Sequence, residues 1–289
     1  MADFGQTVVA AVLCTCAAFG GERALIYPTV IDQGVNMVAD GKWLYPAGDS
    51  VRFSAERRKG GPFSDDAPAW NLKMMAPEGS YWRHPLKVEK GRTYLMGAWM
   101  RVDNAHVAIR GYGGAPSGGH GIDKRVYYFS GFNTCLKPYM SPGTLRRLAG
   151  DPHEWRLLYR HVDFPEGLAG GNLTMAVGIY ITTGEMTFAD PFFIDVTDVK
   201  DRTLTVDVAG TRPFRRIAVM STENGDEVWR MDFNEPVAAF KGIVPADRAD
   251  YAQGLGDEFI NGYSLVVTYA DGTVKTAHAP QENSFTKRR

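Results

Sequence analysis

The stretch at residues 154–196 constrains the fold of this chain more than any other. Within it, every second residue from 173 to 181 is apolar, which is the period of a strand with one buried face. We expect a preceding strand at residues 155–164 and a following strand at 186–196, after a hairpin-like break at 183–184. Three antiparallel strands cannot bury their apolar faces alone. An earlier part of the chain must supply a facing sheet, so the sequence predicts a β-sandwich.

Composition favours an all-β chain. Its 289 residues, 44% hydrophobic and 12% aromatic, suffice for large buried cores. The 32 glycines and 16 prolines are typical of many short strands and turns rather than of a helical bundle. The formal net charge is −1, and only residues 287–289 form a run of like charge. We therefore expect no nucleic-acid partner.

An apolar run at residues 7–19 is too short to span a bilayer, so no transmembrane segment is expected. Its length and apolar composition are those of the hydrophobic region of a secretory signal, although no lysine or arginine precedes it. The run is therefore either part of a signal peptide over residues 1–24 or a buried first strand. A signal would make the protein secreted, periplasmic or displayed at the cell surface. Its removal would leave Cys135 as the last of three cysteines, with no disulfide partner.

Leu86 and Val88 end one expected strand, and after a turn at residues 90–91 the clearest strand of the first half follows at residues 93–102. Its core candidates alternate along the strand and are Tyr94, Met96, Ala98, Met100 and Val102. Trp99 and Arg101 then point away from this core. The next strand, residues 106–112, carries Arg110 and Tyr112 near one side. Glycines follow it, but the next segment reads as a strand rather than a helix, so a dinucleotide-binding loop is not expected.

A second β unit begins near residue 201. Apolar residues alternate over 204–208, segments 215–220 and 227–233 flank Asn224-Gly225, and segments 263–269 and 273–278 flank Asp271-Gly272. Both dipeptides are strong hairpin signals. About six short strands in this space predict a small immunoglobulin-like sandwich. The expected organisation is a jelly-roll sandwich over residues 25–200, the immunoglobulin-like sandwich over 201–280 and a tail at 281–289.

Four segments of the first unit carry a family resemblance: TYLMGAWMRV, EWRLLYRHVDFP, NLTMAVGIY and GEMTFADPFFIDV. Together they resemble the jelly-roll carbohydrate-binding modules of the galactose-binding-like type, with departures at residues 113–124 and 133–152. The resemblance implies an exported, ligand-binding and usually non-catalytic domain. It also implies a structural Ca²⁺ ion, held by Asp190 with backbone carbonyls from early loops. The alternative is that Asp190, which precedes Pro191, forms only a local turn.

The sequence holds none of the motifs HExxH, Cys-x-x-Cys, Gly-x-Ser-x-Gly or the phosphate-binding lysine loop, so we lean against an enzyme. A protein binds a sugar with a flat aromatic ring and a few charged or amide hydrogen-bonding groups. The candidate glycan-binding residues are Trp99, Arg101, Arg110, Tyr112, Tyr127 and Tyr180.

Two questions stay open at this point. The face that carries Trp99 is either an exposed ligand platform or a surface packed under a loop or against the second domain. The function that the sequence favours is non-catalytic binding of a glycan or polysaccharide. The alternatives are a structural or adhesive cell-surface protein that binds protein partners, and a polysaccharide-degrading enzyme whose site lies in the long loops.

Overall fold

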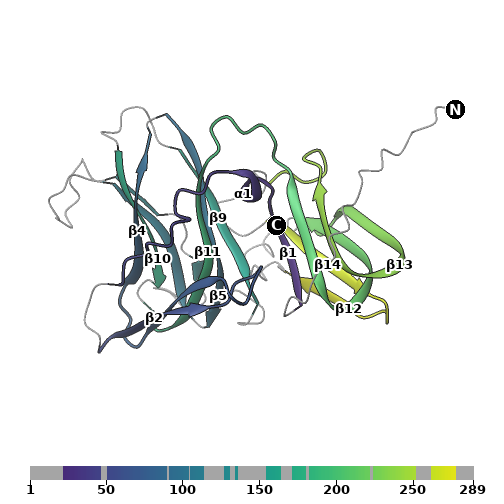
Figure 1. The fold of residues 1–289 in the computed structure, drawn as a ribbon, viewed down its shortest axis with the longest axis horizontal. Coiled ribbons are helices and arrows are strands. Elements are labelled where there is room, and N and C mark those ends of the chain that lie inside the picture. The colour runs from purple at the N-terminus through teal and green to yellow at the C-terminus, as the bar shows by residue number, and fades with distance from the viewer. Residues whose placement is uncertain are drawn as a thin grey trace, which may run out of the picture.

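A computed structural model describes most of the chain: residues 22–46, 51–89, 91–103, 105–113, 127–130, 134–135, 154–163, 171–179, 182–221, 224–251 and 262–277. Strands dominate these residues, and the helix among them is the single turn α1 (Val30–Gln33). The all-β class is therefore confirmed. The strands form three layers along the longest axis of the molecule, which we name the outer sheet, the middle sheet and the C-terminal unit (Figure 1).

The outer sheet and the middle sheet make a β-sandwich. The outer sheet contains, in spatial order, β4 (Ser80–Val88), β10 (Gly171–Ile179), β6 (His106–Gly113) and β7 (Tyr127–Ser130), with β8 (Thr134–Cys135) also paired to β6. The middle sheet contains, in spatial order, β2 (Phe53–Lys59), β3 (Pro68–Met74), β11 (Gly184–Asp195), β5 (Thr93–Asp103) and β9 (Arg156–Asp163).

The space between these two sheets is filled by an aromatic and aliphatic core. The predicted core side of β5 is confirmed, because Tyr94, Met96, Ala98 and Met100 are buried there and Val102 is partly buried. The rings of Trp43, Trp70, Trp82 and Phe188 lie in the same core. Each of these rings buries a large apolar area, which is the main stabilising contribution of such a core.

The three strands at the centre of the sequence do not pair with one another. β9 pairs with β5 in the middle sheet, β10 lies between β4 and β6 in the outer sheet, and β11 returns to the middle sheet. The hairpin expected at residues 183–184 is therefore wrong, since this segment crosses between the sheets. A facing sheet from earlier parts of the chain is present, but it is interleaved with these strands rather than separate from them.

The C-terminal unit is one continuous antiparallel sheet. Its strands are β1 (Arg23–Pro28), β12 (Leu204–Ser221), β13 (Glu227–Val244), β14 (Tyr263–Tyr269) and β15 (Val274–Ala277). β12 changes partner along its length, because residues 204–209 pair with β1 and residues 214–221 pair with β14, while β13 follows both halves. The immunoglobulin-like sandwich expected here stays a prediction.

The first strand of the chain lies in the C-terminal unit rather than in the first sandwich. The boundary between the units in space therefore differs from the sequence division at residue 200, since β1 belongs with β12. Arg23 and Ala24 are paired in β1, so a signal peptide that extended to residue 24 would include the start of this strand. Residues 1–21, which hold the apolar run, lie outside the described residues.

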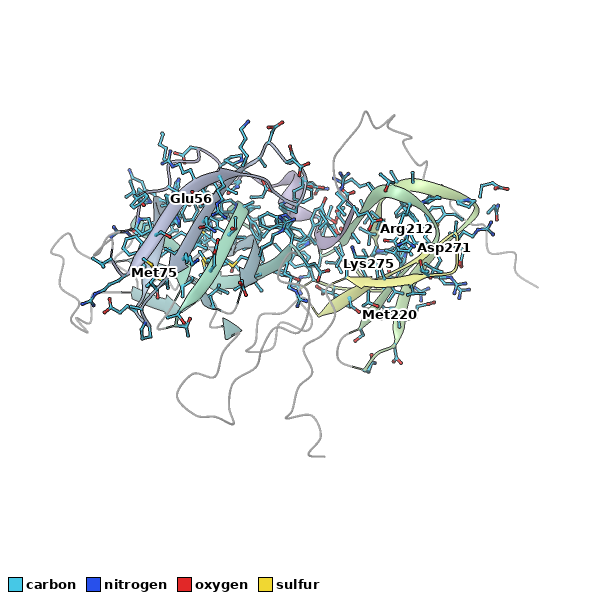
Figure 2. All side chains as sticks on the ribbon, turned by 90° about the horizontal axis from the view of Figure 1, so that it is seen from below. Glu56, Met75, Arg212, Met220, Asp271 and Lys275 are labelled. Carbon is cyan, nitrogen blue, oxygen red and sulfur yellow. The ribbon has the colours of Figure 1, made fainter. Side chains whose placement is uncertain are left out.

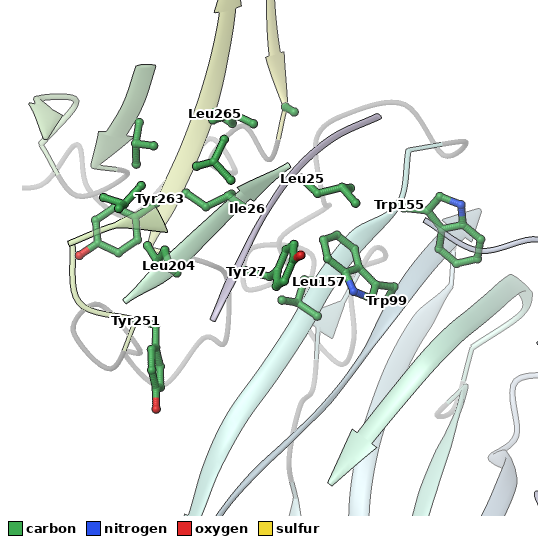
Figure 3. Packing of buried hydrophobic residues seen from close by; sticks show 14 of the residues in the cluster. Leu25, Ile26, Tyr27, Trp99, Trp155, Leu157, Leu204, Tyr251, Tyr263 and Leu265 are labelled. Atoms are coloured by element: carbon green, nitrogen blue, oxygen red, sulfur yellow. The ribbon is translucent and has the colours of Figure 1, made fainter. Parts of the chain in front are cut away.

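The middle sheet packs its second face against the C-terminal unit. Figure 3 shows Tyr27 of β1 beside Trp99 and Leu157 of the middle sheet. The ring of Tyr27 meets Trp99 and Phe63 edge-on, at centroid distances of 6.1 Å and 5.5 Å. Tyr159 of β9 donates a hydrogen bond from its hydroxyl to the carbonyl of Tyr251 at 3.2 Å. One apolar core thus runs without a break from the middle sheet into the C-terminal unit.

Candidate functional site

Trp99 is a core residue. Its side chain is 0% exposed and packs in the junction between the middle sheet and the C-terminal unit. The exposed platform expected for this ring is wrong, and the alternative that its face packs against the second unit holds. The physical reason is that Tyr27 of β1 and Phe63 pack on the face of β5 that alternation left open. A large apolar ring gains most when it is covered.

Arg101 shares the face of Trp99 but lies beyond the covered part. It is exposed, and its guanidinium carbon stands 4.5 Å from the centre of the Trp155 ring, a cation–π contact. Across the ladder it lies opposite Thr187. The middle sheet therefore separates Arg101 from the other candidate residues, which belong to the outer sheet.

The remaining predicted binding residues occupy different register positions of the outer sheet. Arg110 lies opposite Ala176, and Tyr112 lies opposite Thr174 on β10 and Tyr128 on β7. Tyr127 lies opposite Gly113, so Tyr128 rather than Tyr127 shares the register position of Tyr112. Tyr180 lies outside the described residues. The predicted set thus contains one pair, Arg110 and Tyr112, that falls on successive outward rows of a single sheet.

We call the face of the outer sheet that is turned away from the middle sheet the outer face. On β4 its members alternate with the buried Trp82, His84 and Leu86 and are Tyr81, Arg83, Pro85 and Lys87. The β10 positions on this face are Asn172, Thr174, Ala176 and Gly178. Tyr81 and Arg83 were not among the predicted residues, although alternation carried back from Leu86 and Val88 would have identified them.

Tyr81 forms a cross-strand pair with Gly178. A Cβ built on Gly178 would stand 2.7 Å from Tyr81 Cδ1 and 2.0 Å from the carbonyl oxygen of Ser80. The tyrosine ring therefore fills the space that a side chain at position 178 would need, an arrangement in which an aromatic residue compensates for a strand glycine. The Tyr81 side chain is partly exposed, while its hydroxyl oxygen is buried.

Arg83 stands next to this ring, two residues along β4. The described part of the chain offers it no ion-pair partner, in contrast to most arginines there, such as Arg58 and Arg212. In register it belongs to a row that runs Arg83, Ala176, Arg110 and Ser130 across four strands. The small Ala176 separates the two arginine positions. The outer face thus combines an aromatic ring with a cationic hydrogen-bond donor.

Asp190 lies at an irregularity of β11, where the ladder with β5 shifts between Ala189 and Phe192. Its φ of 44° is in the left-handed region, which non-glycine residues rarely adopt. Its Oδ2 atom is buried without a hydrogen-bond partner, and a Cβ built on Gly61 would stand 3.1 Å from that oxygen. Burial raises the pKa of Asp190 to about 6.

An orphaned carboxylate oxygen fits one ligand position around a hard cation such as Ca²⁺. The described residues contain no group of three histidine, cysteine, aspartate or glutamate side chains that could hold a metal. The other ligands around Asp190 would therefore have to be backbone carbonyls. Within the same residues, no helix is long and apolar enough to cross a membrane.

No family model matches this chain, and neither does any curated protein. Among solved structures it is similar to the enzymatically active domain of tailspike protein 4 of bacteriophage CBA120, at 12% identity and a TM-score of 0.38, over 56% of this chain and 21% of that one. It is also similar to the N-terminal tandem of CBM22 modules from Paenibacillus barcinonensis, at 8% identity and a TM-score of 0.37, over 93% and 95% of the two chains.

A third similar structure is a CBM4 carbohydrate-binding module, at 12% identity and a TM-score of 0.33, over 56% of this chain and 92% of that one. The chain spans about a fifth of the length of the tailspike structure that it matches.

Proposed function

We propose that this protein binds a carbohydrate on the outer face without cleaving it. The observation that carries the proposal is the Tyr81–Gly178 pair, which places a partly exposed aromatic ring over a strand glycine beside Arg83. A sugar ring has one face of C–H bonds, which stacks on an aromatic ring, and a rim of hydroxyls, which accepts hydrogen bonds from a guanidinium. The other large face of the sandwich is partly buried under the C-terminal unit, so it offers less open surface.

The register of the outer sheet adds to this argument. Arg110 lies across β10 in the same row as Arg83, and Tyr112 lies in the next row. Tyr128 extends the row of Tyr112 onto β7. A binding surface built over several strands suits a polysaccharide chain better than a single small molecule, because successive sugars can contact successive rows.

The experiment is a polysaccharide panel, neutral and acidic, tested by affinity electrophoresis and then by calorimetric titration. Tyr81→Ala should weaken the best ligand by about tenfold or more, since truncation of a stacking ring typically costs roughly 1–3 kcal/mol of binding. Tyr81→Phe keeps the ring and should bind within about threefold of the unmodified protein, because stacking rather than the hydroxyl carries the contact.

A matched control is available on the middle sheet. Arg101→Ala removes an exposed side chain from the opposite side of the sandwich and should leave binding unchanged. The proposal is wrong if no polysaccharide on the panel binds. It is also wrong in its choice of face if Tyr81→Ala binds as well as the unmodified protein while Arg101→Ala does not.

We further propose that a Ca²⁺ ion binds beside Asp190 and supports the sandwich rather than the ligand. Support comes from the buried, unpartnered Oδ2 atom and from the strained backbone at this residue, which a bound cation would compensate. Asn36 fixes the adjacent backbone, since its amide donates to the Pro191 carbonyl at 2.8 Å and its Oδ1 accepts from the Phe193 amide at 3.1 Å. The site thus lies on a bulge that is held in place.

A further inference from the structure

The outer face carries no acidic residue at any position that its register defines. Those positions are Tyr81, Arg83, Pro85, Lys87, Ala108, Arg110, Tyr112, Tyr128, Ser130, Asn172, Thr174, Ala176 and Gly178. Three of them are permanently cationic in a chain whose formal net charge is −1. The exposed part of the middle sheet differs, because there Glu56, Glu185 and Asp103 alternate with basic residues.

Two of these cations have no ion-pair partner. Among the described residues, neither Arg83 nor Lys87 forms an ion pair, whereas Glu185 on the middle sheet is close to both Arg58 and Lys73. Surface cations in proteins are commonly interspersed with anions, which limits single-sign fields. Cations without ion-pair partners attract an anionic ligand and repel a cationic one.

The spacing of the arginine positions gives the patch a shape. Arg83 and Arg110 lie in one row on β4 and β6, on either side of β10, so their backbones are two strand spacings or about 10 Å apart. Ala176 lies between them in the register, and its small side chain is buried. Guanidinium groups bind carboxylate and sulfate groups through paired, charge-assisted hydrogen bonds.

We propose that the carbohydrate bound on the outer face is anionic, a polysaccharide that carries carboxylate or sulfate groups. This inference rests on the proposed function and specifies its ligand. Arg83 recognises the anionic group, and Tyr81 stacks on the sugar ring that bears it. Arg110 occupies the position two strands away in the same row as Arg83, where a second anionic group of the ligand would lie.

The test compares chemically matched ligands. Polygalacturonate, its carboxyl-reduced neutral form, a sulfated galactan and a single-stranded oligonucleotide are titrated into the intact protein at several salt concentrations. Polygalacturonate or the sulfated galactan should bind at least tenfold more tightly than the neutral form, and the affinity should fall as salt rises. These two arms separate carboxylate from sulfate recognition.

Two arginine variants test whether Arg83 is the residue that recognises the anionic group. Arg83→Gln should weaken the anionic ligand by about tenfold and change binding of the neutral form by less than about twofold, since only the charge-assisted bonds are lost. Arg101→Gln, on the other side of the sandwich, should change neither. The melting temperature of both variants should stay close to that of the unmodified protein, because both side chains are at the surface.

The outcomes distinguish the two proposals. Equal affinity for polygalacturonate and its reduced form would overturn the anionic ligand and leave carbohydrate binding standing. Loss of binding to every polysaccharide would overturn the proposed function itself. Equal affinity for the oligonucleotide and the anionic polysaccharides would show that the surface binds any polyanion through charge alone. This result would also overturn the inference.

Discussion

At the scale of single residues, Trp99 gives the sharpest expectation. Its ring fills the junction beneath Tyr27 and Phe63, so Trp99→Ala should lower the free energy of unfolding by about 3–5 kcal/mol. Chemical denaturation measures this loss. Glycan titration of the folded fraction should give an unchanged dissociation constant, because Trp99 lies on the other side of the middle sheet from the outer face. A stability loss below about 1 kcal/mol would show that the ring is not part of this core.

Trp99 also shows how much the alternation of residues along a strand can predict by itself. The sequence predicted correctly that its side chain opposes Met96 and Met100 across the strand. It could not predict which residues cover that side, because the covering rings of Tyr27 and Phe63 come from parts of the sequence far from β5. A strand with two buried faces and a strand with one exposed aromatic residue have similar local patterns.

Asp190 makes stability depend on pH in a definite direction. The carboxyl of an unfolded chain has a pKa of 3.8, and burial raises it to about 6 in the folded protein. Between these values the folded state holds a proton that the unfolded state has lost, so in chelator the stability that Asp190 contributes is full below pH 4 and is lost as pH rises to 6. Asp190→Asn, which stays neutral, should be more stable than the unmodified protein above pH 6, by up to about 3 kcal/mol.

Calcium should reverse this order of stability between Asp190→Asn and the unmodified protein. A bound cation stabilises the ionised carboxylate, so added Ca²⁺ should raise the melting temperature of the unmodified protein at pH 7 and leave Asp190→Asn unaffected. Melting curves of both proteins, in chelator and in excess Ca²⁺, measure both effects. If Ca²⁺ shifts neither melting curve, the metal proposal is wrong. The predicted effect of Asp190 on the pH dependence of stability is tested separately, by measuring stability in chelator at several pH values.

At the scale of strands, sequence reasoning was most reliable for position. The strand expected at residues 93–102 is observed as β5 over Thr93–Asp103, and the expected residues 263–269 match β14. Pairing was less predictable. β9, β10 and β11 follow one another in sequence, yet each pairs with strands from elsewhere, because the connections between them cross the sandwich rather than fold back within one sheet.

Strand length was underestimated where the ladder is irregular. The sequence suggested separate short strands at residues 204–208 and 215–220, but β12 is continuous through Gly210 and Pro213. Register shifts between Ala209 and Phe214 absorb these residues without ending the pairing. Bulges of this kind depend on the partner strand and so leave little trace in the local sequence.

The candidate site was predictable in part for the same reasons. Arg110 and Tyr112 were identified because their strand has a clear apolar period, and they do share the register of the outer face. Tyr81 and Arg83 were missed because β4 was recognised only from its last residues. The Tyr81–Gly178 pair joins residues almost one hundred positions apart, and only the fold brings them together.

At the scale of the whole molecule, the continuous core determines how the protein should unfold. The two units share buried residues of β1, β5, β9 and β12, and the single strand β1 comes from the opposite end of the chain to the rest of its sheet (Figure 1). Side chains cover both the first sandwich and the C-terminal unit along their full extent, with Glu56 and Met75 on the former and Arg212 and Lys275 on the latter (Figure 2). Neither unit can be removed without exposing apolar side chains of the other.

We therefore expect one unfolding transition for the whole described chain rather than two. Scanning calorimetry should give a single endotherm whose calorimetric and van't Hoff enthalpies agree. Tyr27→Ala, which removes the β1 ring from Trp99 and Phe63, should move that endotherm to lower temperature as a whole, since a shared core couples the two units. Two resolved endotherms, of which Tyr27→Ala shifts only one, would contradict this, because they would mean that the junction is an interface between independently stable units rather than part of one core.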